Sequence, residues 1–326
     1  MIIPMYNCET TIRATLDSLI SSNLPPDEVI CVDDASGDDT VLVVKRFTDC
    51  SPIPVKMVEL SPGCGPAGAR NRGAKESGYS HLLFVDSDVV LRADTIATLM
   101  KRSESLEFRG AVISLYDEHN LAGGVLSDFT TLYSAFNYSF DSAWGSSHFS
   151  SQCALVSRDD FFRVGAFDET YPRATVEDIE FGLRLHAATI PVVSEPEARV
   201  SHNSSYDFRR FVMNYWNKCF DFSYLFFSKR NMFRDRQGYG GRHAQISILL
   251  ISILILSVFG TMIWSCAWWS FSGACGLLVF HWRRFMSYTE RRLGIRRVIP
   301  FLGLKILILG ICAIASIVAP ISRMSR

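Results

Sequence analysis

The chain has 326 residues, and its 33 Lys and Arg residues are balanced by 33 Asp and Glu residues. Residues 241–326, however, hold ten basic side chains and one acid, Glu290, so the first 240 residues are net acidic. An acidic front argues against a nucleic acid polymer as partner, because nucleic acid favours a basic face. The basic and apolar rear suggests that this part of the chain lies in a different solvent from the front. The length allows one large domain or two modest ones.

The cysteines and the first residues bear on the compartment. The nine cysteines are scattered without a C-x-x-C pair, so we expect reduced, buried thiols in a cytosolic setting and no disulfide framework or zinc site. Met1 to Pro4 runs directly into a strand pattern, without a basic segment followed by a long apolar one. This predicts no signal peptide, a slightly clipped first strand and a first domain that folds on the cytoplasmic side.

Helix and strand patterns alternate through residues 1–116. Apolar side chains recur at helical spacing in residues 8–22, and Pro25 and Pro26 end that region before a short apolar strand at 28–32. The remaining pattern predicts strands at 55–60, 81–85 and 111–115, helices at 39–47 and 93–105, and a loop running into a helix at 65–78. Such alternation is typical of an α/β fold with a mainly parallel, Rossmann-like sheet, whose ligands gather at the carboxyl ends of the strands.

Residues 117–205 show a less regular pattern. It predicts a strand at 152–156, helices at 158–164 and 176–188, and a short strand near 198–200. Residues 206–229 are rich in aromatic and basic side chains, which predicts an amphipathic helix in the membrane interface, followed by a linker up to residue 242. The alternative for this segment is an ordinary core helix with a basic edge.

The rear of the chain, residues 243–326, predicts a transmembrane region. Uncharged or nearly uncharged runs cover about 246–264, 266–281 and 298–320, and six arginines lie in the intervening segment 283–297. Because basic flanks tend to stay in the cytoplasm, we favour a tight hairpin followed by a third span, a multi-pass arrangement. One tilted helix across 246–280 is the alternative, and it would place the arginine segment outside.

Carboxylates follow two of the expected strands. Asp86, Ser87 and Asp88 come directly after the strand at 81–85, where two carboxylates can hold a hard divalent ion against a diphosphate. Asp33 and Asp34 follow the strand at 28–32, where a carboxylate can accept hydrogen bonds from a base or a ribose. Taken alone, either acidic run could equally be a turn that caps a helix.

A glycine-rich stretch lies between these two acidic runs. Residues 63–73 contain four spaced glycines together with Arg70 and Arg72, which offer positive charge to a phosphate. The alternative is a Gly-rich loop with solvated arginines. A P-loop is excluded, because Gly-Lys-Ser/Thr does not follow.

Two further groups are candidates for chemistry. Glu177 and Asp178 begin an expected helix, where one of them could be a general base for an acceptor hydroxyl or both could simply complement the helix dipole. His202 could be a metal ligand or a phosphate contact, although a lone histidine is more often neither.

In order and spacing, these motifs resemble those of the family-2 inverting glycosyltransferases. The segments that carry the resemblance are 2–7 (IIPMYN), 32–36 (VDDAS), 65–73 (GPAGARNRG), 84–88 (FVDSD), 164–169 (VGAFDE) and 177–178 (ED). They span roughly residues 1–205, and an ordered set is far more specific than any single motif. Ala35 stands where the family commonly has Gly, and the Gln-x-x-Arg-Trp signature of processive synthases is absent.

The resemblance implies a GT-A-type catalytic domain over residues 1–205, with a nucleotide-sugar-binding half at 1–116 and an acceptor half at 117–205. It implies a Mg²⁺ or Mn²⁺ ion and a nucleotide-sugar donor, and it assigns roles to individual residues. Asp34 would contact the base, Asp86 the ribose or metal, Asp88 the metal, and Asp178 would be the base that deprotonates the acceptor. Donor-pocket neighbours would be Pro4, Tyr6, Glu9, Asp33, Arg70, Arg72 and Ser87.

The function expected from this resemblance is transfer of one sugar to a lipid or lipid-linked glycan at the cytoplasmic membrane face. Two alternatives remain open. One is a polyprenyl-phosphate glycosyltransferase, whose phosphate acceptor needs less of a base. The other is a catalytically silent membrane scaffold, which would have no chemical need of Asp86, Asp88 and Asp178.

Overall fold

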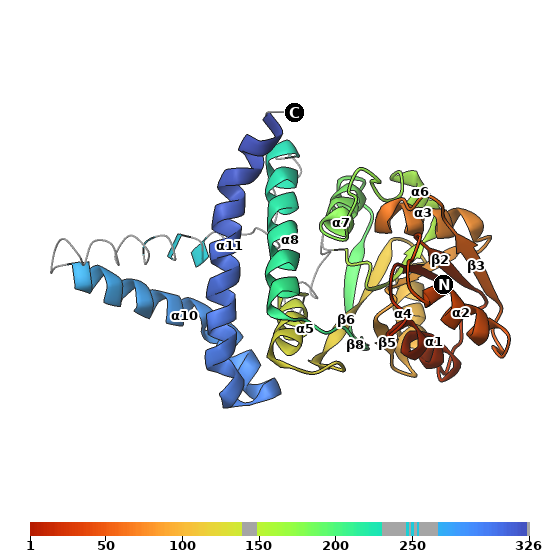
Figure 1. The fold of residues 1–326 in the computed structure, drawn as a ribbon, viewed down its shortest axis with the longest axis horizontal. Helices are drawn as coiled ribbons and strands as arrows, with labels where there is room; N and C mark the ends of the chain where they lie inside the picture. Colours follow the sequence, from red (N-terminus) through yellow and green to blue (C-terminus); the bar gives the residue numbers. More distant parts are fainter. Residues whose placement is uncertain (139–148, 230–245, 248, 251–252, 254–266, 325–326) are drawn as a thin grey trace. The chain divides into compact units, whose positions relative to one another are not determined.

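The computed structural model describes all residues except 139–148, 230–245, 248, 251–252, 254–266 and 325–326 (Figure 1). The chain forms two compact units, Met1–Ser205 and Tyr206–Arg326.

The first unit is built on one eight-stranded sheet with the order β3-β2-β1-β4-β7-β6-β8-β5. The strands are β1 (Ile2–Met5), β2 (Val29–Asp33), β3 (Val55–Glu59), β4 (His81–Val85), β5 (Val89–Leu91), β6 (Ala111–Asn120), β7 (Cys153–Ser157) and β8 (Val192–His202). β1 to β4 run parallel, as do β6 and β8, whereas β7 is antiparallel to both of its neighbours and β5 is antiparallel to β8. The expected α/β fold is confirmed, and its sheet is mixed.

Helices cover both faces of this sheet (Figure 1). The helices are α1 (Ile12–Ile20), α2 (Thr40–Thr48), α3 (Gly65–Glu76), α4 (Thr95–Glu104), α5 (Val125–Tyr138), α6 (Arg158–Arg163) and α7 (Glu177–Ala187). Because successive strand side chains point to opposite faces, Ile3 of β1 joins the core under α1, α2 and α4, while Ile2 joins the core under α3, α6 and α7. Burial of these two apolar layers is the main stabilising contribution.

Helix α3 lies unusually close to the sheet, and glycine makes this possible. A Cβ added at Gly73 would come within 2.5 Å of Cγ2 of Ile2, so a larger residue would push the helix away from β1. The helix begins at Gly65, which has φ of +80° and lies against the carbonyl of Pro172. Residues 65 and onward, expected to begin as a loop, are therefore helical from the start.

The second unit contains α8 (Phe208–Ser228), α10 (Ala267–Leu293), a short 3-10 turn η2 (Ile295–Arg297) and α11 (Val298–Met324). Within the described residues, one stretch, Ile295–Ala319, is long and apolar enough to cross a membrane. Most of the first expected span, 246–264, lies outside the described residues. The multi-pass arrangement is not supported, because the described residues contain this one candidate span. Helix α10 also does not end near residue 281 but continues through the arginine segment to Leu293, where a loop was expected.

Helices α8 and α11 run side by side in the same direction (Figure 1). Cys219 is joined to Cys312 by a disulfide, and one turn further Oγ of Ser223 lies 3.2 Å from Oγ of Ser316. Both pairs are 93 residues apart in sequence, so the helices are parallel. The interfacial position expected for 206–229 stays a prediction.

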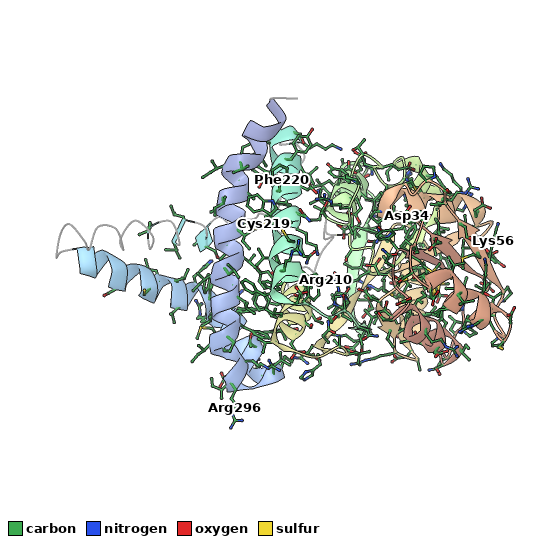
Figure 2. The ribbon with its side chains drawn as sticks, in the orientation of Figure 1. Asp34, Lys56, Arg210, Cys219, Phe220 and Arg296 are labelled. Carbon is green, nitrogen blue, oxygen red and sulfur yellow. A yellow bond between two sulfur atoms is a disulfide. The ribbon has the colours of Figure 1, made fainter. Side chains whose placement is uncertain are left out.

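The expectation about cysteines is also corrected. Cys219 and Cys312 form a disulfide, and Figure 2 labels Cys219 on α8. Cys50 and Cys64 are exposed rather than buried. Spacing alone did not indicate the disulfide, because the pair is formed by packing of two helices that are distant in sequence.

Candidate active site

The carboxyl ends of the parallel strands β1, β2 and β4 meet at one edge of the sheet. The acidic side chains that follow β2 and β4 are therefore brought to the same edge, as expected for a ligand site of this architecture. The loops after β1 and β2 are joined there by hydrogen bonds. The N–H of Gly37 donates to Oδ1 of Asn7 over 2.8 Å, and the N–H of Asp39 donates to Oε2 of Glu9 over 2.9 Å.

Asp34 links the end of β2 to the start of α3 (labelled in Figure 2). Its carboxylate accepts the backbone N–H of Cys64 over 2.6 Å and that of Gly65 over 2.9 Å. These N–H groups precede or begin the helix, where an anion is stabilised by the helix dipole. A Cβ at Gly63 would lie 2.8 Å from the carbonyl oxygen of Asp34, so this close approach requires glycine.

The other predicted donor-side residues differ in their exposure. Tyr6 is 63% exposed and available to stack on a planar ligand, whereas Pro4 is buried within β1. Asp33 is buried, and its Oδ2 accepts the N–H of Ser36 over 3.1 Å. Among the described residues its Oδ1 has no hydrogen-bond partner. Asp33 therefore shapes the turn after β2.

Arg70 connects the motif after β4 with the start of α7. Its Nη2 donates to Oδ1 of Asp86 over 2.7 Å, and its Nη1 donates to Oε1 of Glu177 over 3.1 Å. Arg70 and Glu177 are only 3% and 2% exposed, so their ion pair is buried, whereas the side chain of Asp86 is 30% exposed. The other carboxylate oxygen of Glu177 accepts the N–H of Thr175 over 2.8 Å.

The charge balance of this network favours ionised Arg70. Burial alone would lower the pKa of the guanidinium, but the charges of Asp86 and Glu177 outweigh burial and raise its pKa above the usual value. The planar guanidinium can serve two carboxylates from two directions, which an ammonium on a flexible stem does less well. Arg70 therefore holds Asp86 and the N-terminus of α7 at a fixed separation.

The residue after Arg70 extends this connection. The side-chain amide of Asn71 donates to the carbonyl of Phe167 over 2.9 Å and to Oε1 of Glu169 over 2.8 Å, and its oxygen accepts the N–H of Phe167. Asn71 is buried. The GARN segment of α3 thus fixes both the 164–169 segment and the start of α7, which explains why those motifs occur together.

Asp88 and His202 come together although 114 residues separate them. Nε2 of His202 lies 3.3 Å from Oδ2 of Asp88. The three-residue strand β5 pairs with β8 so that Val89 lies opposite His202, and the N–H of Asn203 donates to the carbonyl of Asp88. The antiparallel register of β5 and β8 therefore positions this pair.

Three side chains surround the buried ring of His202. The ring stacks on Tyr116 with centroids 4.9 Å apart, and its Nδ1 lies 3.3 Å from both the amide nitrogen of Asn120 and the hydroxyl of Thr131. The amide of Asn120 is oriented by the N–H of Ala122, which donates to its oxygen. These contacts fix the ring plane and leave Nε2 directed at Asp88.

The Asp88–His202 pair fits a divalent ion. A carboxylate oxygen and an imidazole nitrogen are suitable ligands, and two neighbouring ligands of one octahedral ion lie about 3 Å apart. Among the described residues there is no group of three or more His, Cys, Asp or Glu side chains that could hold an ion. The remaining ligands would have to come from a bound diphosphate, from water or from Asp86, which is already paired with Arg70.

Asp178 lies beside Glu177 in the first turn of α7, but its surroundings differ. It is partly exposed, whereas Glu177 is buried and bonded through both oxygens. Oδ1 of Asp178 accepts the N–H of Ile179 over 2.7 Å. Of the two acids expected to be catalytic, Asp178 is therefore the more accessible, and Glu177 is held by Arg70 and Thr175.

Arg72 does not join the site. Its side chain is 53% exposed and pairs with Glu76 one turn along α3, at 2.9 Å. Residues two apart on a helix point in nearly opposite directions, so Arg72 cannot face Asp86 and Glu177 as Arg70 does. Ser87 contributes its carbonyl, which accepts the hydroxyl of Thr15 over 3.1 Å.

The sequence profile of the family described as Glycosyl transferase family 2 matches residues 1–164. Over 201 residues the chain is 24% identical to a poly-beta-1,6-N-acetyl-D-glucosamine synthase of Staphylococcus epidermidis, a match that covers 60% of this chain and 48% of that protein. Over 88 residues it is 38% identical to the UDP-Glc:alpha-D-GlcNAc-diphosphoundecaprenol beta-1,3-glucosyltransferase WfaP of Escherichia coli, covering 27% and 34%. The chain thus spans about half the length, or less, of these relatives.

Solved structures share the fold. The mannosyltransferase PcManGT of Pyrobaculum calidifontis, in complex with GDP-Man and Mn²⁺, matches with a TM-score of 0.63 and 17% identity, covering 97% of this chain and 86% of that one. Residues 1–349 of TarS from S. aureus, in complex with UDP-GlcNAc, match with a TM-score of 0.51 and 15% identity, covering 97% and 89%. The family match and the GT-A-like fold lead to one conclusion: this chain belongs to glycosyl transferase family 2.

Proposed function

We propose that the protein transfers one sugar from a nucleotide-diphosphate sugar to a lipid or lipid-linked glycan at the cytoplasmic face of a membrane, with inversion at the anomeric carbon. The observation that carries this proposal is the Asp86–Arg70–Glu177 network. It joins the Asp-x-Asp motif, which would hold the donor, to the helix that presents Asp178, which would receive the acceptor's proton.

The donor would lie at the sheet edge formed by β1, β2 and β4. Exposed Tyr6 and the Asp34 carboxylate at the start of α3 are placed for the nucleoside, with Glu9 holding the neighbouring loop. The solved neighbours support this class of donor, since PcManGT carries GDP-Man and the TarS fragment carries UDP-GlcNAc. The nucleotide preference of this chain is therefore the first property to measure.

A Mg²⁺ or Mn²⁺ ion would be held by Asp88 and His202, with Asp86 nearby. When bound, such an ion supplies positive charge that stabilises a leaving diphosphate. The chain's own residues set up this place: Tyr116 and Asn120 fix the ring of His202, and Arg70 fixes Asp86. The PcManGT structure contains Mn²⁺, which supports the choice of cation.

Asp178 would act as the general base. The carboxylate takes the proton of the acceptor hydroxyl as that oxygen bonds to the anomeric carbon, while the bond between this carbon and the diphosphate oxygen breaks. Attack opposite to the leaving group inverts the configuration. Because Glu177 is bonded to Arg70 and to the N–H of Thr175, it keeps Asp178 in place and does not take part in proton transfer.

Three observations support, in turn, the membrane location, the lipid-linked acceptor and the transfer of a single sugar. The apolar stretch Ile295–Ala319 supports a membrane location. WfaP is named for an acceptor linked to diphosphoundecaprenol, which supports a lipid-linked acceptor here. The sequence lacks the Gln-x-x-Arg-Trp signature of processive synthases, which supports transfer of a single sugar.

The test is a donor screen on the full chain in detergent or nanodiscs. UDP-, GDP- and dTDP-sugars would each be supplied with a polyprenyl-diphosphate-linked acceptor, with and without Mn²⁺, and product anomers would be assigned by NMR. We expect one class of donor to give a product of inverted configuration, and we expect the reaction to require Mn²⁺. Retention of configuration, or absence of transfer from every donor, would contradict the proposal. A phosphate-terminated acceptor that still reacts after Asp178→Asn would instead favour a polyprenyl-phosphate glycosyltransferase.

A further inference from the structure

The turn between α10 and α11 concentrates positive charge. Residues 283–297 hold six arginines and one acid, Glu290, in a chain whose overall charge is zero. Five of these arginines, at 283, 284, 291, 292 and 296, are exposed. Figure 2 shows Arg296 at this corner with its side chain directed away from the helices. We name residues 283–299 the arginine corner.

Part of this charge has a local explanation. Arg291 and Arg292 lie in the last turn of α10, where they complement the helix dipole. Arg283 stacks on Phe280 with its Cζ 3.9 Å from the ring centroid. These contacts do not explain Arg284 and Arg296, and a single helix end does not call for six cations.

Apolar side chains are exposed beside the charges. Gly294, with φ of +84°, ends α10 and turns the chain into η2 and α11. At this turn Ile295 is 65% exposed and Ile299 is 80% exposed. Exposing two large aliphatic side chains to water costs free energy in proportion to their exposed apolar area. A partner of this corner should therefore accept both guanidinium groups and apolar side chains.

The corner lies at the start of the stretch that could cross a membrane, Ile295–Ala319. A helix of that length spans about 37 Å, which exceeds a hydrocarbon core of about 30 Å and would place its first turn at the level of the headgroups. An anionic bilayer offers phosphates at that depth and acyl chains just below it. Nucleic acid would match the arginines alone and leave both isoleucines in water.

We propose that the arginine corner binds anionic lipid headgroups, with guanidinium groups on lipid phosphates and Ile295 and Ile299 inserted among the acyl chains. The preference is for an anionic over a zwitterionic lipid surface. The inference rests on the proposed membrane location but not on the chemistry of sugar transfer, so the two can fail separately.

The experiment uses the full chain purified in a neutral detergent. Phosphatidylglycerol and phosphatidylcholine of the same chain length are titrated separately, and native mass spectrometry counts the protein molecules that retain lipid. We expect phosphatidylglycerol to be retained at least about tenfold better at low salt, with the preference falling as salt is raised. Equal retention of the two lipids would overturn the inference.

The variants separate this corner from net charge. Arg284→Gln/Arg292→Gln/Arg296→Gln should lower phosphatidylglycerol retention by about tenfold or more. The matched control, Arg13→Gln/Arg46→Gln/Arg109→Gln, removes three exposed arginines from the first unit and should leave retention unchanged. An equal loss in both variants would contradict a local site.

Two further measurements complete the test. Arg296→Gln alone removes one exposed side chain in η2, so it tests the corner even if the triple variant misfolds, and it should reduce retention severalfold. An RNA oligonucleotide that abolishes phosphatidylglycerol retention while binding more tightly than the lipid would favour nucleic acid and overturn the inference. Sugar transfer measured on the same samples shows whether the proposed function holds independently.

Discussion

Arg70 donates a 3.1 Å hydrogen bond to Glu177 across 107 residues of sequence, and both side chains are buried. With Asp86 on its other side, this guanidinium lies between two carboxylates and offsets part of their mutual repulsion. The candidate active site therefore depends on a residue that we do not expect to touch the reacting atoms.

Removal of Arg70 should destabilise the protein because it leaves the buried carboxylate of Glu177 and the partly exposed carboxylate of Asp86 without a counter-charge. Arg70→Met should lower the free energy of unfolding by about 3–5 kcal/mol, measured by urea denaturation of the full chain in detergent. Arg72→Met, an exposed control on the same helix, should change it by less than about 0.5 kcal/mol. If the two variants behaved alike, the network would not be a stabilising element.

A double-mutant cycle tests the Arg70–Glu177 pair directly. Glu177→Gln alone keeps a hydrogen-bond acceptor for Arg70. Arg70→Met alone leaves the carboxylate of Glu177 buried and unpaired, and adding Glu177→Gln to it removes that unpaired charge. We expect the double variant to be more stable than the sum of the two single changes predicts, by about 1–3 kcal/mol. Strict additivity would show that the two side chains are not energetically coupled.

The surroundings of His202 should control affinity for the metal. Asn120→Ala removes a neighbour of Nδ1 and should raise the concentration of Mn²⁺ required for half-maximal binding by about 10–100-fold. The measurement is Mn²⁺ binding by electron paramagnetic resonance in the presence of a nucleoside diphosphate. The control is His119→Ala, which removes the exposed histidine adjacent to Asn120 in the sequence and should leave Mn²⁺ affinity unchanged. Unchanged Mn²⁺ affinity in Asn120→Ala would remove Asn120 from the site.

Ala35 is held in a left-handed conformation, with φ of +62°. An alanine is strained there and glycine is not, which gives a physical reason why glycine is common at this position in the family. Ala35→Gly should therefore raise the free energy of unfolding by about 0.5–1 kcal/mol. Ala14→Gly, within helix α1, should lower it by about 1 kcal/mol. A loss of stability in both variants would refute the strain.

Cys64 offers a probe of the donor site, because its backbone N–H binds Asp34 and its thiol is exposed. Partial burial and the neighbouring charge of Asp34 raise the pKa of the Cys64 thiol, so labelling should be slow at neutral pH and faster above it. A bound nucleoside diphosphate should slow maleimide labelling of Cys64 and leave Cys50, the other exposed thiol among the described residues, unaffected. Equal protection of both cysteines, or of neither, would place the nucleotide elsewhere.

The clustering of acidic residues at the strand ends was predictable, because parallel strands all end on the same side of the sheet. β2 and β4 were expected within one or two residues of their observed bounds, and Asp34 and Asp86 follow from the shared edge. The helical start at Gly65 was not predicted, since it depends on Asp34 accepting two N–H groups from a distant segment. Helical periodicity would have separated Arg70 from Arg72 had the helix been expected to begin there.

The pairing of Asp88 with His202 could not be predicted from the sequence, although each residue was a candidate metal ligand. It rests on β5, a strand of three residues that follows directly on the acidic motif and carries too little pattern to predict. Tyr116 and Asn120 lie on a part of β6 beyond its expected end, where polar residues obscured the strand. The Cys219–Cys312 disulfide likewise comes from the packing of α8 on α11, about which local sequence says nothing.

The most direct test separates binding from turnover at Asp178. Affinity for the Mn²⁺ nucleoside diphosphate, by calorimetry, and the rate of sugar transfer would be measured for Asp178→Asn and for Asp159→Asn, an exposed acid at the start of α6. We predict that Asp178→Asn slows transfer by about 10²–10⁴-fold and leaves nucleotide affinity within about twofold, and that Asp159→Asn changes neither. Full turnover in Asp178→Asn would contradict the assignment of the base.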